Sequence, residues 1–382
     1  MTDDRPRVLI VYHHLPHYRS GVFAELERSR DVAYEFAAGT ASRDGTIPTI
    51  PPTSLRRFFR LANHWLGPFL WQTGLLSVLW RERHHAVVFF GDMKYLSTWV
   101  GALLCRWRGQ SVLFWAIGWH RPDAGLRKRV RLAFYRLGHK LLLYGHTGAR
   151  IGTELGYPAD RIAIVGNSHI SSITATGTRD EIGIEDLDLL LPGVDVDVVT
   201  AVVRLTRPKR LDLVVAAAAH LGKTGRKVVV VLVGTGPERE NLRRLADDLG
   251  VDLRLTGPIY EEEKLRLIYE RTSVSVVPVN AGLTAVQSLS HGRPMITSDD
   301  EYHRAPESEC IRPGQTGGFY VDGSAESLAE VVAEWLDRVR AEPETVAGAC
   351  RHEVETRWTS SAHAAAINTA VTAALTRPEC VS

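Results

Sequence analysis

Length and composition place the chain among two-domain globular proteins. It has 382 residues, of which 45% are hydrophobic and 24% are charged, and its formal net charge is +2. A single hydrophobic core rarely grows beyond about 250 residues, so we expect two domains. The small charge excess argues against a nucleic-acid-binding protein, because such proteins usually present a strongly basic face.

Cysteine usage and the N-terminus bear on the cellular compartment. The cysteines are widely spaced and form no Cys-x-x-Cys pair: Cys105, Cys310, Cys350 and Cys380. This spacing argues against a zinc site or a disulfide framework and is typical of reduced thiols. The N-terminal apolar run reads as a first strand and not as a signal peptide. We therefore expect a cytoplasmic protein.

The first half of the chain alternates strand and helix patterns. Continuous apolar runs, typical of parallel strands that are covered on both faces, occur at residues 7–13, 33–38, 86–90, 112–117, 141–145 and 162–166. Helical patterns lie between them at residues 21–28, 96–107 and 126–137. This alternation predicts a doubly wound parallel sheet.

Residues 62–80 are apolar enough to resemble a membrane span. A span needs about 20 apolar residues, whereas polar side chains and the pair Gly67-Pro68 interrupt this run. Pro68 suits the first turn of a helix. We therefore predict a buried helix here, with Trp65 and Trp71 at a solvated rim.

A second series of strands and helices follows a polar and then acidic stretch at residues 171–195, which we interpret as a linker. Strand patterns occur at residues 197–205, 227–234, 252–257, 273–279 and 294–297, and helical patterns near 325–340 and 345–375 end the chain. We predict an α/β protein of two doubly wound, Rossmann-like domains that face each other across a cleft. The expected bounds are residues 1–170 and 196–345, with helices of residues 346–382 packing back toward the first domain.

Four turns of the second half follow predicted strands, at the edge where open α/β sheets bind ligands. In the first turn, Arg204 and Lys209 could neutralise a diphosphate leaving group without a metal ion. A solvated basic loop before a helix explains the same residues. In the second turn, Gly234 and Gly236 would let phosphate or sugar approach the backbone, although Pro237 at a helix start is a sufficient structural reason.

The third and fourth turns suit a nucleoside and a phosphate. In the third, the backbone of Ile259 and the ring of Tyr260 suit a flat nucleobase, and a plain tight turn explains them nearly as well. In the fourth, a helix with free amides is expected to begin around Thr284, and such an end binds anions. Thr284 and Gln287 have the spacing of a capping box, whereas in a functional interpretation Gln287 points back at a ribose.

These turns together resemble the retaining family 4 glycosyltransferases, also called glycosyltransferase group 1, which have the GT-B fold. The residues that follow the family's order and spacing between about 200 and 330 are Arg204-Leu205, Lys209, Gly234-x-Gly236-Pro237, Gly257, Pro278, Gly282-Leu283-Thr284, Gly292-x-Pro294 and Gly314-x-Thr316-Gly317. The first half is similar more loosely, through Leu15-Pro16-His17-Tyr18-Arg19 and Gly118-Trp119-His120.

The resemblance implies a division of roles on the donor side. Arg204 and Lys209 would hold the donor diphosphate, together with the amides of Gly282, Leu283 and Thr284, and the segment around Ile259 would border the base. Gln287 stands where the family has a glutamate that binds ribose hydroxyls, and an amide can still bind a hydroxyl.

Two departures from the family concern the sugar and the acceptor. The other glutamate of the family's pair corresponds to Val279, beside Asn280, which leaves the identity of the donor sugar open. Many relatives carry a histidine directly before Gly118, where this chain has Ile117. His120 is the candidate to replace that histidine. The remaining acceptor-side candidates are His17, Tyr18, Arg19, Gly118 and Trp119, each of which an ordinary loop also explains.

Two further patterns were weighed against structural explanations. The Asp-x-Asp pairs Asp186/Asp188 and Asp195/Asp197 are interpreted as solvated linker charge, so we predict no metal requirement. The basic helical pattern of residues 127–140 is interpreted as a packed helix with a solvated rim. If the acceptor is lipid-linked, an anionic membrane would dock there.

We therefore predict a retaining, metal-independent and cofactor-independent transfer of sugar from a UDP- or GDP-linked donor. The acceptor is a small molecule or a lipid-linked glycan, in glycan or natural-product biosynthesis. A sugar-nucleotide epimerase or a phosphorylase on the same fold is an alternative. A non-catalytic sugar-nucleotide binder is another alternative, and the change at Val279 is the only feature that favours it. A dinucleotide-dependent oxidoreductase is disfavoured, because no glycine-rich fingerprint follows the first strand.

Overall fold

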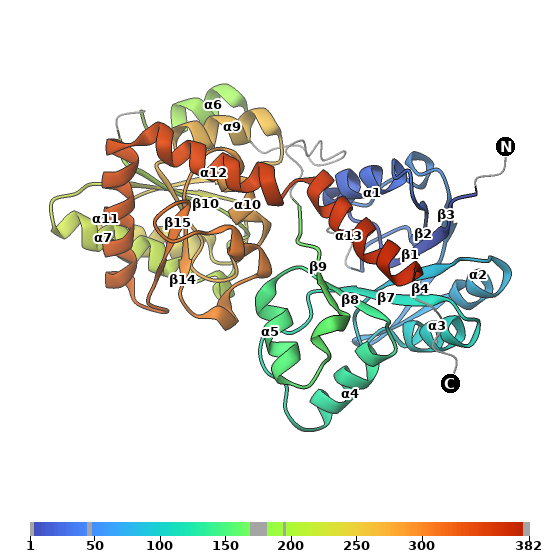
Figure 1. Ribbon diagram of the computed structural model, residues 1–382. Coiled ribbons are helices and arrows are strands. Elements are labelled where there is room, and N and C mark those ends of the chain that lie inside the picture. The colour runs from blue at the N-terminus through green and yellow to red at the C-terminus, as the bar shows by residue number, and fades with distance from the viewer. Residues whose placement is uncertain (1–3, 44–47, 169–181, 194–195, 377–382) are drawn as a thin grey trace. The chain divides into compact units, whose positions relative to one another are not determined.

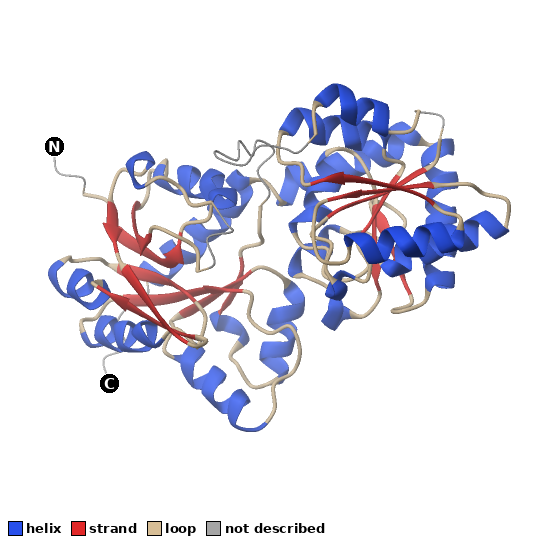
Figure 2. Ribbon diagram, turned by 180° about the vertical axis from the view of Figure 1, so that it is seen from behind, coloured by secondary structure: helices blue, strands red, loops and turns tan. Residues whose placement is uncertain are grey.

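The computed structural model describes residues 4–43, 48–168, 182–193 and 196–376 (Figure 1). The chain divides into a first unit of residues 1–170 and 360–382 and a second unit of residues 171–359. Both units are α/β, with helices on the faces of a parallel sheet (Figure 2). No helix among the described residues has the length and apolar character needed to cross a bilayer.

The first unit contains a seven-stranded parallel sheet of order β3-β2-β1-β6-β7-β8-β9, and a separate antiparallel pair, β4-β5. Its strands are β1 (Arg7–His14), β2 (Ala33–Gly39), β3 (Phe58–Arg60), β4 (Ala62–Leu66), β5 (Phe69–Thr73), β6 (Ala86–Phe90), β7 (Ser111–Ala116), β8 (Lys140–Leu143) and β9 (Ile162–Ile164). Its helices are α1 (Ser20–Glu27), α2 (Leu75–Arg81), α3 (Leu96–Trp107), α4 (Gly125–Arg136), α5 (His146–Glu154) and α13 (Ser360–Leu375), with the short 3₁₀ helix η1 (His17–Arg19) after β1.

Both faces of the first sheet are covered, which explains why its strands read as continuous apolar runs. Val8 and Ile10 of β1 pack in a core with residues of α1 and α13. Leu9 and Val11 point to the other face and pack with residues of α2 and α3. Alternate residues of one strand therefore belong to two cores.

The predicted helix over residues 62–80 is wrong. The segment forms the hairpin β4-β5 and then the short helix α2. Gly67 takes a positive φ of 54° and, with Pro68, forms a tight turn that pairs Leu66 with Phe69. Exposed and less exposed residues alternate along both strands, which is the period of a strand and not of a helix. Trp71 is exposed as expected, and Trp65 is half-buried.

The second unit contains a six-stranded parallel sheet of order β12-β11-β10-β13-β14-β15. Its strands are β10 (Val198–Val202), β11 (Val229–Val233), β12 (Asp252–Gly257), β13 (Val274–Val276), β14 (Met295–Ser298) and β15 (Gly317–Tyr320). Its helices are α6 (Ile184–Leu190), α7 (Asp212–Lys223), α8 (Arg239–Leu249), α9 (Glu262–Arg271), α10 (Leu283–Ser290), α11 (Ala325–Ala341) and α12 (Pro343–Arg357), with 3₁₀ helices η4 (Arg207–Lys209), η5 (Glu301–His303) and η6 (Pro306–Cys310).

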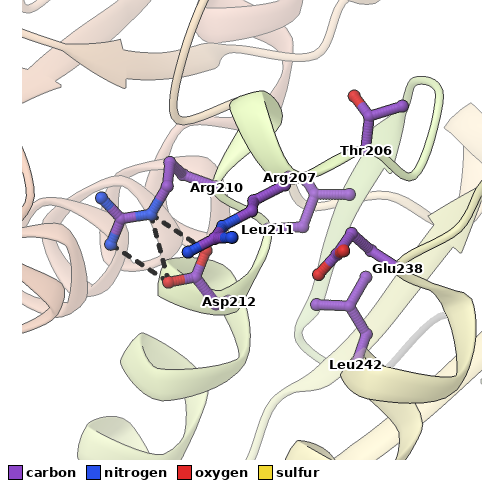
Figure 3. Close-up of a pocket in the computed structure, with 7 residues that line it drawn as sticks. All are labelled: Thr206, Arg207, Arg210, Leu211, Asp212, Glu238 and Leu242. Atoms are coloured by element: carbon purple, nitrogen blue, oxygen red, sulfur yellow. Dashed lines mark hydrogen bonds and ion pairs between the residues drawn. The ribbon is translucent and has the colours of Figure 1, made fainter.

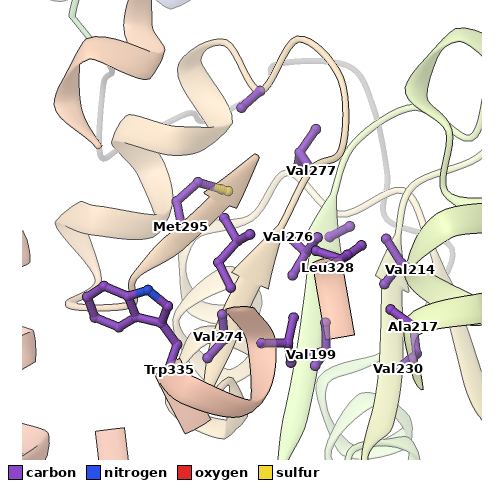
Figure 4. Packing of buried hydrophobic residues seen from close by; sticks show 14 of the residues in the cluster. Val199, Val214, Ala217, Val230, Val274, Val276, Val277, Met295, Leu328 and Trp335 are labelled. Carbon is purple, nitrogen blue, oxygen red and sulfur yellow. The ribbon is translucent and has the colours of Figure 1, made fainter. Parts of the chain in front are cut away.

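The second sheet is also buried on both faces. Val199 and Val230 pack in one core with Val214 of α7 and with Leu328 and Trp335 of α11 (Figure 4). The opposite face packs in a separate core with α6 and α9. The expected architecture of two α/β units with parallel sheets is confirmed.

The segment interpreted as a linker contains structure in its described part. Residues 184–190 form α6, whose Leu187 is fully buried in a core with residues of β11 and α9. Asp188 forms an ion pair with Arg271 at 2.9 Å. The interpretation of Asp197 as solvated charge is wrong, because its side chain is only 12% exposed and accepts from Arg226 and Arg340. Asp195 lies outside the described residues, and Asp186 is exposed on α6.

The helical pattern near residues 345–375 is two helices. They are interrupted at Trp358, whose buried indole Nε1 donates to Glu353 at 3.2 Å. α12 belongs to the second unit, and the chain returns to the first unit at residue 360. Within the first unit, α13 packs with α1 in one core.

Candidate functional site

Three turns at the carboxyl edge of the second sheet are joined by main-chain hydrogen bonds. Leu205 N donates to Thr235 O at 3.0 Å, which connects the turn after β10 to the turn after β11. Gly234 N donates to Gly257 O at 2.8 Å, which connects the turn after β11 to the end of β12. The first three turns singled out in the sequence therefore form one continuous edge.

Gly234 and Gly236 are needed for the packing of these turns. A Cβ atom at Gly234 would lie 2.1 Å from the carbonyl oxygen of Val203, and one at Gly236 would lie 2.2 Å from that of Leu205. No residue with a Cβ atom could make contacts this short, so only glycine fits at these two positions. The close approach of two protein turns therefore explains both glycines without a ligand.

Lys209 joins this edge to the fourth turn, between β13 and α10. Its Nζ donates to the carbonyl oxygens of Asn280 and, at 3.4 Å, of Val279. Burial lowers the pKa of Lys209, and the nearby carboxylate of Glu307 raises it by a smaller amount. The partly desolvated ammonium group of Lys209 is thus held at Asn280, two residues before Gly282.

The start of α10 is open and uncapped by side chains. Gly282 is the N-cap residue, with φ 56° and ψ −147°, and an added Cβ there would meet no atom closer than 3.9 Å. The hydroxyl of Thr284 donates to Val202 O at 3.1 Å, which fixes the helix start against β10. The amides of Leu283 and Thr284 lie in the first turn, where main-chain donors have no intrahelical acceptor and the helix dipole favours an anion.

Gln287 does not form the capping box that the spacing allowed. It is buried, and its Oε1 accepts from the hydroxyl of Tyr269 at 3.3 Å. The ring of Tyr269 stacks on His291 at a centroid distance of 4.5 Å. Burial lowers the pKa of His291 to about 4. The amide is therefore held one turn inside α10 by an aromatic pair.

Arg204 is exposed, and its side chain makes no hydrogen bond or ion pair with the described residues. A cavity of about 450 Å³ opens beside the same turn. It is lined by Thr206, Arg207, Arg210, Leu211, Asp212, Glu238 and Leu242 (Figure 3). Figure 3 shows the side chains of Arg210 and Asp212 facing each other. Arg210 Nη2 donates to Asp212 Oδ2 at 3.1 Å, so the charge of Arg210 is already paired. This cavity is not lined by Arg204 or Lys209, so we distinguish it from the Lys209–α10 site.

The two candidates of the third turn differ in their exposure to solvent. Ile259 is buried, and its side chain packs in the core of α6 and α9, so only its backbone is available to a ligand. Tyr260 is exposed. Asn280 takes a positive φ of 57°, and its amide donates to His303 O at 2.8 Å.

In the first unit, η1 follows β1 and carries three acceptor-side candidates. The ring of His17 contacts Pro48 O at 3.2 Å, and Tyr18 is half-buried. Arg19 is buried: it donates to the hydroxyl of Tyr144 at 2.6 Å, and its guanidinium lies 4.8 Å from the ring centroid of Trp115. Arg19 therefore connects the carboxyl ends of β1, β7 and β8 inside the unit.

The three candidates on the loop after β7 differ in their contacts and exposure. Gly118 has φ 82°, and its carbonyl accepts from Arg131 at 3.2 Å. Trp119 is 1% exposed and packs against Gly152, so its side chain is part of the core and not of a surface that an acceptor could reach. His120 is exposed on the same loop.

Comparison with known proteins bears first on the second unit. Residues 196–338 match the family model described as "Glycosyl transferases group 1". This segment is therefore similar to the group 1 glycosyltransferases. A GDP-mannose-dependent α-(1-6)-phosphatidylinositol monomannoside mannosyltransferase of Mycobacterium tuberculosis is 28% identical over 281 residues, in an alignment that covers 62% of this chain and 70% of that protein.

Solved structures resemble the chain along nearly its whole length. Anabaena HepE in complex with UDP matches with a TM-score of 0.71 and 14% identity, over 97% of this chain and 100% of that chain. A glycosyltransferase from Rickettsia africae matches with a TM-score of 0.72 and 13% identity, over 98% and 100%. At such identities the likeness concerns the fold, and it confirms the expected GT-B class.

Two features of the structure were missed in the sequence. Glu307 of η6 is buried and lies close enough to Lys209 to affect its pKa, but it comes almost 100 residues later in the chain, and no local pattern marks it. His13, at the end of β1, is packed among Tyr95 and Phe90, and burial lowers its pKa to about 3. The run His13-His14 was a visible signal that was not used.

Proposed function

We propose that the chain is a glycosyltransferase that uses a nucleoside diphosphate sugar, and that the diphosphate binds between Lys209 and the first turn of α10. One observation carries the proposal: a partly desolvated ammonium group is held on the loop that leads into an uncapped helix N-terminus. A half-buried cation and oriented amides together favour a charged phosphate group. Arg204, exposed beside them, is proposed as a second cation on the diphosphate.

We propose that transfer proceeds on one face of the sugar, with retention of configuration. The bond between the anomeric carbon and the diphosphate oxygen breaks, and the acceptor oxygen forms its bond to the same face. The acceptor proton moves to the leaving phosphate oxygen. Fixed cations at Lys209 and Arg204 would stabilise the charge that develops on the diphosphate, so the proposed route requires neither an enzymatic nucleophile nor a metal ion.

The remaining donor contacts follow from the geometry of the same edge. The backbone at Ile259 and the ring of Tyr260 are proposed to border the base, and Gln287 is proposed to reach the ribose. Asn280 is proposed to contact the sugar. UDP- and GDP-linked donors are both supported, since HepE was solved with UDP and UDP-glucose and the mycobacterial relative is named as GDP-mannose-dependent.

On the acceptor side, the proposal narrows to His17, Tyr18 and His120, because Arg19 and Trp119 are buried within the first unit. The mycobacterial relative is named for a phosphatidylinositol mannoside acceptor. We propose a glycan acceptor on a lipid carrier, with a soluble small-molecule acceptor as the alternative. We propose that the protein acts in the cytoplasm, at the inner face of a membrane.

The first test is a thermal-shift series with UDP, GDP, dTDP, ADP and CDP in the presence of EDTA. A ligand at 100 times its Kd stabilises the fold by about 2.7 kcal/mol, which is easily measured. We expect one nucleotide to give the largest shift, and Lys209→Ala or Arg204→Ala to reduce it. Arg207→Ala, on the same turn but in the neighbouring cavity, is the matched control. Absence of a shift with every nucleotide would overturn the proposal.

The second test follows the product. NMR of the product formed with the winning donor is expected to show the anomeric configuration of the donor, and an inverted product would exclude same-face transfer. The donor incubated alone should remain unchanged, whereas conversion to an isomer would reveal an epimerase.

If transfer did require a metal ion, the described residues offer a candidate site for it. Asp300, His303 and Asp322 place three potential metal ligands within 4.8 Å of one another. We expect full activity in EDTA. If EDTA abolished activity and Mn²⁺ restored it, Asp322→Asn would show whether this group is the site.

A further inference from the structure

The hairpin β4-β5 exposes large apolar side chains on its outer face. One face of the two strands consists of residues that are all exposed: Ala62, His64, Leu66, Phe69, Trp71 and Thr73. Three of them, Leu66, Phe69 and Trp71, are large and apolar, and Leu66, beside the turn, is 79% exposed. A water-facing strand face normally carries polar side chains. This face is therefore built to contact something apolar.

The opposite face of the hairpin carries the polar side chains of Asn63 and Gln72 into the unit, together with the apolar Trp65 and the fully buried Leu70. The amide nitrogen of Gln72 donates to Tyr12 O at 3.0 Å, and that of Asn63 donates to His13 O at 2.6 Å. Both acceptors belong to the end of β1, from which the chain continues into η1. These hydrogen bonds fix which face of the hairpin is exposed, and they join the hairpin to the strand that precedes the acceptor-side candidates of η1.

A neighbouring helix carries a second apolar stripe. Leu96, Val100, Leu103 and Trp107 of α3 recur at helical spacing and are all exposed. Trp107 stacks on the exposed Trp80 of α2, with parallel rings 6.1 Å apart. α2 and α3 lie side by side (Figure 1), and Leu70 N of β5 donates to Lys94 O, two residues before α3. Hairpin, α2 and α3 thus carry one group of exposed apolar residues, which we call the apolar surface.

The apolar surface is concentrated and aromatic. It consists of Leu66, Phe69, Trp71, Trp80, Leu96, Val100, Leu103 and Trp107. Among the described residues, these are eight of the eighteen large hydrophobic side chains that are exposed, and they include every exposed tryptophan. Tryptophan is the residue typical of membrane–water interfaces, because its ring is apolar and its N–H is polar.

Charge distinguishes between the candidate occupants of this surface. Residues 55–108 contain eight Lys or Arg and two Asp or Glu, a net charge of +6, whereas the whole chain carries +2. Arg108 lies over the ring of Trp80 at 5.1 Å, and Arg43 donates to Gly67 O at the hairpin turn. A second copy of the chain would bring an equal positive charge against the first, and an anionic partner would be attracted.

We propose that the apolar surface binds an anionic lipid bilayer, with Leu66 and Phe69 of the hairpin turn inserted among the lipids and the surrounding arginines on the headgroups. The surface differs from the basic helix expected from the sequence, since Leu132, Phe134 and Tyr135 of α4 are buried. Binding would bring the end of β1, and so the acceptor loop, to the membrane. The proposal does not depend on the proposed donor.

The test is sedimentation of the full chain with vesicles of phosphatidylcholine alone or mixed with phosphatidylglycerol. We expect binding to the mixed vesicles that weakens with added salt, and a loss of at least tenfold in the double variant Leu66→Ser and Phe69→Ser. Leu189→Ser is the matched control, because Leu189 of the second unit is 83% exposed and lies outside the surface. Unchanged melting temperatures and nucleotide shifts would show that both variants are folded and that donor binding is unaffected.

Three results would overturn the proposal. The first is no binding to either vesicle, and the second is equal binding by the double variant and the wild type. The third is a concentration-dependent dimer in sedimentation velocity that the double variant abolishes, since this would assign the surface to a second copy. A transferase that binds no nucleotide but still binds mixed vesicles would contradict the proposed function and leave the membrane surface in place.

Discussion

The ammonium group of Lys209 donates to the main-chain carbonyl oxygen of Asn280, 71 residues later in the chain. This contact connects the turn after β10 to the loop that begins α10, so the cation and the helix N-terminus are positioned together. Neither element alone is a specific phosphate site. Their connection explains why a lysine in this turn would act on the same ligand atoms as the amides of Leu283 and Thr284.

Replacement of Lys209 tests this connection. Hydrogen bonds to charged groups contribute about 1.5–3 kcal/mol, and each 1.4 kcal/mol is a factor of about ten in Kd. We expect Lys209→Met to weaken binding of the preferred nucleoside diphosphate about 10- to 100-fold in calorimetric titration. Arg207→Met is the control, and an equal loss in both variants would reduce the effect to general charge.

The pH dependence of binding should carry the mark of Lys209. Burial lowers the pKa of its amino group, and Glu307 opposes this by a smaller amount. A diphosphate binds the protonated form, so affinity should fall as pH rises through this lowered pKa. We expect the decline to begin at a lower pH than an ordinary lysine would give, and to disappear in Lys209→Arg, because arginine stays charged. Identical pH profiles for the wild type and this variant would assign the decline to another group.

Gly282 should be required because of its backbone conformation, and not because a side chain would lack space there. Its φ of 56° and ψ of −147° are strained for any residue with a side chain, yet an added Cβ would meet nothing within 3.9 Å. We expect Gly282→Ala to cost about 1–3 kcal/mol of unfolding free energy and to weaken nucleotide binding. The control is Gly348→Ala in α12, where no atom lies within 4 Å of the added Cβ; there alanine should stabilise the helix by up to about 1 kcal/mol. Equal melting temperatures for Gly282→Ala and the wild type would show that the loop relaxes.

The role of Gln287 can be separated from that of the diphosphate site. If its amide reaches the ribose, Gln287→Ala should weaken binding of the nucleoside diphosphate several-fold and leave binding of inorganic pyrophosphate unchanged. Tyr269→Phe is the companion variant, because it removes the 3.3 Å hydrogen bond to Gln287 without removing the amide. A parallel loss of both ligands in Gln287→Ala would indicate a structural role inside α10.

The doubly wound units could be predicted because their strands are buried on both faces. β1 contributes Val8 and Ile10 to one core and Leu9 and Val11 to another, so the strand is apolar throughout. The hairpin β4-β5 could not be predicted in this way, since large apolar residues lie on both of its faces and Asn63 and Gln72 point inward. A segment that is apolar on its exposed face as well appears in a sequence as a buried one.

The site was only partly readable for a related reason. Gly282 and Lys209 follow strands directly, and strand ends mark ligand positions in open α/β sheets. Glu307 reaches Lys209 through the packing of η6 in the folded unit, and Asp197 finds Arg226 and Arg340 from distant helices and turns. Sequence spacing carries no information on such long-range pairs. The burial of Trp119 could not be predicted for the same reason, because the residue that makes room for its ring, Gly152, comes 33 residues later in the chain.

His291 should make the second unit sensitive to acid. Burial lowers its pKa to about 4, and Arg293 acts in the same direction. The imidazole is stacked on Tyr269, and Glu262 lies 3.6 Å from its Nε2. Since an unfolded histidine has a pKa of about 6.5, the unfolded chain takes up a proton that the folded unit resists. Stability is therefore full above pH 6.5 and is lost as pH falls toward 4.

The size of this loss and its assignment can be measured together. We expect the unfolding free energy to fall by about 1–3 kcal/mol between pH 6.5 and 4, after allowance for the partial exposure of the ring. His291→Phe retains a ring that can stack on Tyr269 but cannot titrate, so its melting temperature should decline less steeply over this range. His352→Gln, at an exposed position of α12, should follow the wild type. If His291→Phe instead followed the wild type, the loss would belong to the first unit, where burial also lowers the pKa of His13, to about 3, and that of His363.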